Sequence, residues 1–246
     1  MSAANGPGRA AAAEATRADM AAQPEPQHAV APEPFGPALP ISVRTSDREV
    51  GVLMSLDHPR IVLFGGLLSE TECDELVAMS RHKVERSRTV NRDTGAVDLH
   101  VDRSSEGTYF SLDENPLVAR IDRRIAELLD WPIENGEGLQ VTRYGPGGEY
   151  KPHYDYFDTA DPGSAPHIAH GGNRVATLVI YLATTLQGGA TIFPDAGLEI
   201  APVKGNAVFF SYAALSTDTL TLHAGAPVMA GEKWIASKWL RQRAYR

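Results

Sequence analysis

The sequence predicts a mainly β protein, an antiparallel sandwich or jelly roll braced by helices, and two observations support this fold class. In the front half of the chain, N-cap residues precede apolar positions spaced three and four apart, which is the pattern of helices. After Gly138, short runs of β-branched and aromatic residues alternate with glycine-rich turns. A helical front half followed by many short strands favours an antiparallel β fold with helices packed on it.

Both predicted helices have recognisable start signals. Ser69 and Glu72 form a capping-box pattern, and apolar residues follow them at helical spacing. Asn115 and Pro116 mark the second start, because proline suits the first helical position. The second helix is expected to end near Asp130.

Eight strands are expected in the second half of the chain. They cover residues 139–144, 150–157, 174–182, 190–193, 199–203, 207–212, 220–223 and 234–241. The polar stretch 158–173 is rich in Gly, Pro and His, and it is expected to be a long loop that borders a site.

Composition divides the chain into a tail and one domain. Residues 1–40 hold 13 Ala and 7 Pro. Such a segment buries too little apolar surface to offset its ordering entropy, so we predict a disordered Ala/Pro-rich tail at 1–40 and a single domain at 41–246.

The sequence composition also predicts where the protein is located and which kinds of partner it binds. One cysteine, no secretory signal pattern and no long apolar run predict a cytoplasmic protein without membrane contact. A net charge of −8 argues against a nucleic-acid partner. The oligomeric state is left open, with a homodimer as one option.

A metal site is predicted from a His-x-Asp pair. His153 and Asp155 lie in one predicted strand, so their side chains point to one face. His223, from another predicted strand, adds a second imidazole. Two histidines and one carboxylate leave open positions on non-haem Fe(II), as oxygen activation requires. A second pair, His100 and Asp102, is set aside because no site-like sequence follows it.

Lys233 is the predicted anchor for a second ligand. It is one of five lysines in the chain and follows His223 by ten residues, across a turn region at 225–231. A hairpin-like return would bring it back beside that histidine. A dicarboxylate that chelates iron at one end needs a cation at the other, which a partly buried lysine supplies. The alternative is an ordinary surface lysine.

Taken together, the motifs resemble the catalytic domain of the prolyl 4-hydroxylases, within the Fe(II)/2-oxoglutarate-dependent oxygenases. The resemblance extends from about Ile61 to Gln242 of the 246 residues. Its motifs are segments 139–144, 150–157, 172–177, 181–182, 188–194, 202–205 and 223–239. It implies a double-stranded β-helix (jelly-roll) core with N-terminal helices packed on it, in a compact, bacterial-type form.

The resemblance also implies a reaction, the hydroxylation of proline at its 4-position in a peptide or protein, like that of procollagen-proline 4-dioxygenases. O2 and 2-oxoglutarate are consumed, and succinate and CO2 are formed. The implied cofactors are Fe(II), 2-oxoglutarate as co-substrate, and ascorbate, which restores oxidised iron. His153, Asp155 and His223 are the implied iron ligands, and Lys233 pairs with the distal carboxylate of 2-oxoglutarate.

Further positions match the family's site lining. Those implied at the 2-oxoglutarate pocket are Tyr144, Thr177 and Trp239. Those implied near the peptide groove are Tyr150, Arg174, Glu137 and Arg103. On the residues alone, each has an ordinary structural alternative, such as a core tyrosine, a strand threonine, a packed tryptophan or a surface ion pair.

Three rival functions stay open. The same oxygenase chemistry could act on a lysyl residue, a free amino acid or a damaged nucleobase. A degenerate oxygenase fold could bind proline-rich segments without catalysis. A cupin-like protein could use His167 and His170 in the polar loop as metal ligands.

Overall fold

The computed structural model describes residues 31–245 except 36–37, 91–93, 95, 100–103 and 213. Most of the predicted tail therefore lies outside the described residues, as do His100, Asp102 and Arg103. Of the rest of that segment, Phe35 packs edge-on against Phe64, with 6.0 Å between the ring centroids.

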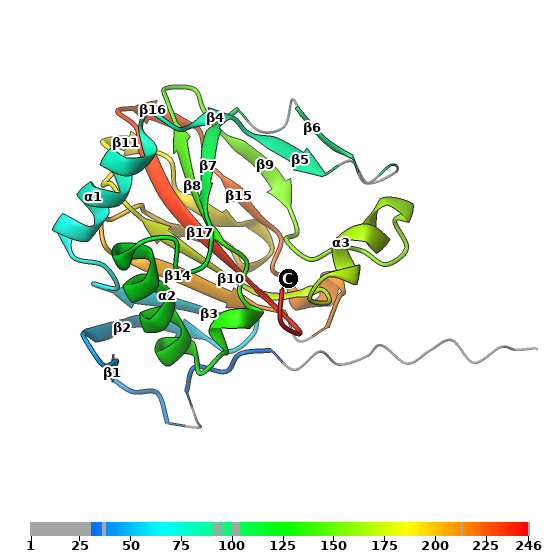
Figure 1. Cartoon of the computed structure of the whole chain (residues 1–246), viewed down its shortest axis with the longest axis horizontal. Coiled ribbons are helices and arrows are strands. Elements are labelled where there is room, and N and C mark those ends of the chain that lie inside the picture. The colour runs from blue at the N-terminus through cyan, green and yellow to red at the C-terminus, as the bar shows by residue number, and fades with distance from the viewer. Residues whose placement is uncertain are drawn as a thin grey trace, which may run out of the picture.

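The strands form two large antiparallel sheets (Figure 1). The nine-stranded sheet has the order β1-β2-β3-β14-β10-β17-β8-β7-β4 and the four-stranded sheet the order β13-β12-β15-β9. The first comprises β1 Ser42–Arg44, β2 Glu49–Leu56, β3 Ile61–Gly65, β4 Glu85–Arg86, β7 Glu106–Phe110, β8 Leu139–Tyr144, β10 Arg174–Tyr181, β14 Ala207–Ser211 and β17 Lys233–Arg241. The second comprises β9 Tyr150–His153, β12 Thr191–Phe193, β13 Leu198–Ile200 and β15 His223–Gly225.

Smaller elements complete the fold. Two ribbons are formed by β5 Arg88–Val90 with β6 Val97–Leu99, and by β11 Gln187–Gly188 with β16 Val228–Ala230. The helices are α1 Glu70–Ser80, α2 Pro116–Leu129 and α3 Ala165–Ala169, and the short 3-10 turns are η1 Ile133–Asn135, η2 Pro162–Ser164, η3 Pro194–Ala196 and η4 Thr217–Thr219. Within the described part of the chain, no helix is long and apolar enough to span a membrane.

Both predicted helices form, and their caps are the predicted ones. The Ser69 side chain accepts from the Glu72 backbone N–H while the Glu72 carboxylate accepts from the Ser69 backbone N–H, which completes the capping box. The Asn115 side chain accepts from two backbone N–H groups of the first turn of α2. Helix α2 ends at Asp130 in a left-handed conformation.

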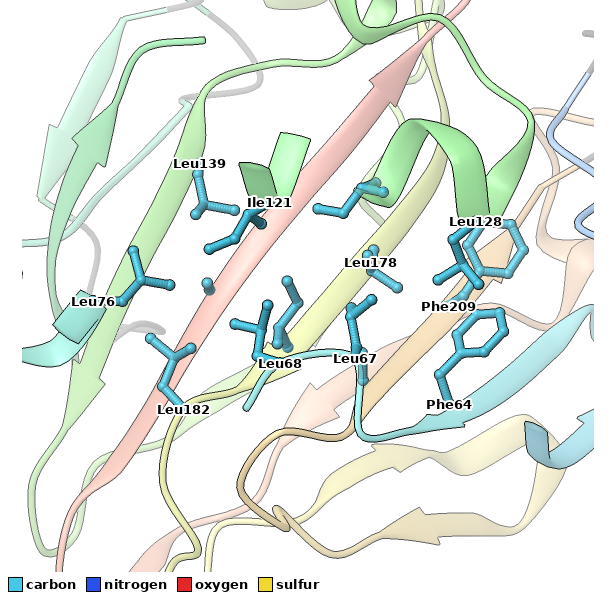
Figure 2. Close-up of a cluster of buried hydrophobic side chains, with 14 of the residues drawn as sticks. Phe64, Leu67, Leu68, Leu76, Ile121, Leu128, Leu139, Leu178, Leu182 and Phe209 are labelled. Carbon is cyan, nitrogen blue, oxygen red and sulfur yellow. The ribbon is translucent and has the colours of Figure 1, made fainter. Parts of the chain in front are cut away.

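The core has two layers, one on each face of the large sheet. Along β17, Trp234, Ala236 and Leu240 face one cluster and Ile235 faces the other, because successive strand residues point to opposite sides. The first cluster joins the sheet to α1 and α2, as Figure 2 shows for ten labelled side chains. The second cluster fills the space between the two sheets. The predicted jelly-roll class with packed N-terminal helices is confirmed.

Four local predictions are wrong. The front half is not simply helical, because β1 to β7 also lie there. The strand expected at 150–157 ends at His153, and the one expected at 220–223 begins only at His223, after Leu220 takes a left-handed φ of 52°. The stretch 158–173 is not wholly loop, since it contains η2 and α3, where prolines suit the first helical turn.

Candidate active site

His153, Asp155 and His223 converge at one end of the jelly roll. His153 ends β9 and lies directly opposite His223, the first residue of β15. Asp155 follows two residues after β9, and its two carboxylate oxygens lie 3.5 Å from His153 Nε2 and 3.5 Å from His223 Nε2. One potential ligand atom from each side chain lies within 4.8 Å of the others. The structure thus brings the three predicted ligands together.

Backbone carbonyls fix which nitrogen of each histidine faces the cluster. His153 Nδ1 lies 2.9 Å from the carbonyl oxygen of Lys151, and His223 Nδ1 lies 3.0 Å from that of Thr221. Each Nδ1 therefore carries the proton and donates it to a carbonyl, which leaves both Nε2 lone pairs directed at the Asp155 side. This is the arrangement of metal-ligating histidines in proteins.

The protonation states also suit a metal. Burial and the neighbouring His153 lower the pKa of His223 to about 4, so its imidazole is neutral at pH 7. Burial opposes ionisation of Asp155, but His223, His153 and Arg174 outweigh it and hold the pKa of this carboxyl well below its usual range. Two imidazoles and one carboxylate are the donor set of a non-haem Fe(II) centre with open positions. His167 and His170 belong to no such three-residue cluster in the described chain.

Lys233 lies between the sheets near this cluster. Its side chain is 3% exposed, and Nζ lies 5.7 Å from the ring centroid of Tyr144, the residue opposite it in β8. Nζ also lies close to the backbone of β15: it is 3.7 Å from the point where a Cβ on Gly225 would lie, and Gly225 is two residues after His223. The described residues place no carboxylate within ion-pair distance of it, and burial lowers the pKa of Lys233 to about 8. A buried cation without a counter-charge is costly, so this position suits the carboxylate of a ligand.

The route by which Lys233 reaches the site differs from the predicted hairpin. β15 and β17 belong to different sheets, and the β16 segment between them pairs with β11. The two sheets face each other, so the lysine approaches the His223 strand from the opposite layer. The predicted proximity is found, but sheet packing rather than a hairpin produces it.

The two other residues predicted to line the 2-oxoglutarate pocket differ in whether their polar atom already has a hydrogen-bond partner. Trp239 is on the same face of β17 as Lys233, and its buried Nε1 has no hydrogen-bond partner among the described residues, so it is a donor that a ligand could satisfy. Thr177 is already engaged, because its hydroxyl donates to Asp155 Oδ2 at 2.7 Å and lies 2.7 Å from the Tyr212 hydroxyl. Thr177 therefore contacts a predicted metal ligand; the lining of the 2-oxoglutarate pocket, which the resemblance implied for it, stays a prediction.

The residues expected at the peptide groove separate into two groups. Tyr150 stacks on His153 with ring centroids 3.7 Å apart, at the edge of the cluster. Arg174 and Glu137 instead form a largely buried ion pair, with Arg174 Nε donating to Glu137 Oε1 at 2.7 Å. Arg174 also donates to the backbone carbonyl of Asp155 at 3.3 Å, so this pair braces the metal cluster. Arg103 lies outside the described residues.

Arg241 is a supporting residue that the sequence reasoning missed. Its Nε donates to Glu137 Oε1 at 2.7 Å, and its Nη1 donates to the carbonyls of His167 and Gly172 at 2.9 and 2.7 Å. It therefore ties the segment that follows Asp155 to the end of β17. The signal for it was its even step from Trp239, which puts both side chains on one face of the strand.

Replacing Arg241 with methionine is expected to lower the free energy of unfolding by about 3 kcal/mol, because the change removes one partner of a buried ion pair and leaves two carbonyls without their donor. Urea unfolding measures this. Arg143→Met is the matched control, since Arg143 also bridges separate segments through its ion pairs with Glu106 and Glu232, but its side chain is one-third exposed. It should cost less than about 1 kcal/mol. Equal losses in both variants would contradict the structural role of Arg241.

Comparison with known proteins places this geometry in a family. Residues 139–241 match the 2OG-Fe(II) oxygenase superfamily. The chain is 35% identical over 205 residues to prolyl 4-hydroxylase 2 of Arabidopsis thaliana, covering 74% of this chain and 67% of that protein. A solved structure of the viral collagen prolyl hydroxylase from Paramecium bursaria Chlorella virus-1, a 2OG complex, superposes with a TM-score of 0.57 at 34% identity, covering 74% of this chain and 95% of the other.

The chain belongs to the prolyl 4-hydroxylase family. The family predicted from the sequence is thereby confirmed, and the superfamily's description names two of the predicted cofactors, Fe(II) and 2-oxoglutarate. The chain is also 37% identical over 189 residues to the bovine prolyl 4-hydroxylase subunit alpha-1, covering 76% of this chain. It spans only 35% of the length of that bovine subunit. The matched 139–241 segment contains the three clustered residues and Lys233.

Proposed function

We propose that this prolyl 4-hydroxylase-family chain hydroxylates proline at its 4-position in a peptide or protein, using Fe(II), 2-oxoglutarate and O2. One observation carries the proposal. A cluster of two histidines and an aspartate shares the space between the sheets with a buried lysine that has no counter-charge among the described residues. Relatives named as prolyl 4-hydroxylases and as a collagen prolyl hydroxylase support proline as the target.

The residues fit the implied groups. His153, Asp155 and His223 would hold Fe(II), and Lys233 would hold the distal carboxylate of 2-oxoglutarate. When bound, iron and 2-oxoglutarate together activate O2 and transfer one oxygen atom to a C–H bond, with release of succinate and CO2. The protein directs both Nε2 atoms and the ionised Asp155 carboxylate at the place where the metal would bind.

Partly exposed aromatic side chains beside the cluster suit a proline-containing chain. Tyr150 stacks on His153, and Tyr154 lies 5.1 Å from Tyr156 between ring centroids. Proline-rich segments adopt the polyproline II conformation and dock on aromatic surfaces, because that conformation is preformed and little entropy is lost on binding. The inner side of Tyr156 packs against the buried Tyr212, with centroids 5.7 Å apart, which anchors this part of the surface.

Succinate release and peptide mass, measured together, test the proposed function. The purified protein is incubated with Fe(II), 2-oxoglutarate, ascorbate and a proline-rich peptide, and His153→Ala is the control. We expect succinate and a gain of one oxygen atom on proline, both lost in the variant. A matched peptide with its prolines replaced by alanine should stay unmodified.

The rival functions give different outcomes in the same experiment. Succinate formed without peptide oxidation would keep the oxygenase chemistry and favour another substrate, such as a lysyl residue or a free amino acid. Tight peptide binding by iron-loaded protein that consumes no 2-oxoglutarate would favour a non-catalytic binding module.

A further inference from the structure

Three buried polar side chains form a continuous chain that ends on the aspartate of the cluster. The carboxylate oxygen Oδ2 of Asp155 accepts from the Thr177 hydroxyl at 2.7 Å, and the Thr177 Oγ1 lies 2.7 Å from the Tyr212 hydroxyl. All three residues are buried, and Tyr212 has no exposed surface. They come from three separate parts of the chain: the segment after β9, strand β10 and the residue that follows β14.

The direction of the two hydrogen bonds follows from the chemistry of the groups. An ionised carboxylate only accepts, so Thr177 must use its single hydroxyl proton to donate to Asp155. Thr177 then has no proton left for Tyr212, so the Tyr212 hydroxyl donates to Thr177 Oγ1. The chain therefore runs in one direction, from Tyr212 through Thr177 to Asp155, and adjacent hydrogen bonds of this kind strengthen each other.

We propose that Tyr212 is a positioning residue of the iron site, acting through Thr177 on Asp155. This inference rests on the proposed function, which puts iron at the His153–Asp155–His223 cluster. The donated hydrogen bond fixes the rotation of the Asp155 carboxylate and withdraws charge from Oδ2. Outer-shell partners of metal ligands act in this way, and their loss typically weakens metal binding about 10- to 100-fold.

Packing alone does not account for a tyrosine at this position. Its ring contacts Phe210 and Tyr156, with centroid distances of 6.2 and 5.7 Å, and a phenylalanine ring would fill the same space. Burying the extra hydroxyl is costly unless it is hydrogen-bonded, and the hydrogen bond that it forms with Thr177 leads to the cluster. If the role of Tyr212 were purely structural, the Tyr212–Thr177 hydrogen bond would only satisfy the buried hydroxyl, and its loss would not change the affinity for Fe(II).

The test is an anaerobic titration of the metal-free protein with Fe(II), without 2-oxoglutarate or peptide. Tyr212→Phe is expected to weaken Fe(II) binding about 10-fold relative to the unmodified protein. Tyr181→Phe is the matched control, because Tyr181 is equally buried and donates to another threonine, Thr191, at 2.8 Å, away from Asp155. Its Fe(II) affinity should stay within about 2-fold, which is less than the effect expected of an outer-shell partner.

A double-mutant cycle shows whether the effect passes through Thr177. In a Thr177→Val background, Tyr212→Phe should cause no further loss of Fe(II) affinity, whereas an effect that adds in full would overturn the proposal. An Fe(II) affinity of Tyr212→Phe equal to that of the unmodified protein would overturn it as well. If Tyr212→Phe does not fold, Thr177→Val decides: Tyr212 acts only through Thr177, so unchanged affinity there also refutes the inference.

Failure of the Tyr212 inference can be distinguished from failure of the proposed function. Failure of the unmodified protein to bind Fe(II), or equal binding by His153→Ala, would remove the iron site itself. Normal Fe(II) binding that is lost in His153→Ala but unaffected in Tyr212→Phe would remove only the role assigned to Tyr212.

Discussion

Asp155→Asn is expected to weaken Fe(II) binding by more than about 100-fold, beyond what loss of an outer-shell partner costs. Asparagine keeps the shape of the side chain and can still accept from the Thr177 hydroxyl. It lacks the charge, however, and Asp155 is the one carboxylate of the three-residue cluster. With a pKa of about 4, His223 is neutral at pH 7 and adds no anionic donor. Anaerobic calorimetry with Fe(II) measures the loss, and succinate formation should disappear with it.

Asp122→Asn provides the matched control for this substitution. Asp122 is also a buried aspartate, but it pairs with Lys238 at 2.7 Å on the helix-facing side of β17, away from the cluster. Its replacement leaves Lys238 without its partner, so it should lower stability by about 3 kcal/mol or more while Fe(II) affinity is retained. Fe(II) affinity of Asp155→Asn within tenfold of the unmodified protein would show that Asp155 is not a metal ligand.

Local sequence patterns predicted the elements that have local causes. The capping box at Ser69 and the cap at Asn115 were predictable because each hydrogen bond in them joins residues at most three apart in the sequence. Strand β10 was visible because both of its faces are buried, which gives a nearly unbroken apolar run. Strand β17 is also buried along its whole length, and its tryptophans and isoleucine indicated a strand although polar residues interrupt the run. Strands β1 to β7 were missed because they are short or partly exposed. Some of them also depend on pairing with a distant segment, as β3 does with β14.

The site shows the same division between local and long-range causes. His153 and Asp155 were predictable as a pair because two residues separate them, and the structure brings them together even though β9 ends between them. The role of Thr177 could not be predicted in this way. Its neighbours across the sheet are Phe210 in β14 and Trp239 in β17, and only this register brings its hydroxyl within reach of Tyr212 and Asp155. No spacing within one segment encodes that contact.

The buried Arg–Glu network includes two residues that the sequence predicted near a peptide groove. Arg174 and Glu137 matched positions near a peptide groove, but in the structure they face each other and Arg241. The Arg174 guanidinium lies 4.0 Å from the ring centroid of Trp239, so the network also packs against the wall of the proposed co-substrate pocket. A single network therefore braces Asp155 and this wall, which is why rigid support and substrate contact were difficult to separate from sequence alone.

Lys233→Met is expected to raise the dissociation constant of 2-oxoglutarate by about 100-fold or more, since loss of one partner of a buried charge pair costs 2–5 kcal/mol. The measurement is 2-oxoglutarate binding to the Fe(II)-loaded protein under anaerobic conditions. Fe(II) affinity without 2-oxoglutarate should not change, because Lys233 is not one of the three clustered ligands. A comparable loss of Fe(II) affinity in this variant would contradict the assigned role and indicate a disrupted site.

The lowered pKa of Lys233 gives the same interaction a pH dependence of defined sign. The dicarboxylate binds the protonated lysine, and burial sets the pKa of this group in the free protein to about 8. Below pH 8 the lysine is charged before binding, so affinity should be nearly constant. Above pH 8 the lysine must take up a proton on binding, so the dissociation constant should rise up to tenfold per pH unit.

In Lys233→Arg the charge persists to higher pH, so the curve of this variant should stay flat from pH 7 to about 9.5. Identical pH curves for the two proteins would show that Lys233 does not bind the distal carboxylate.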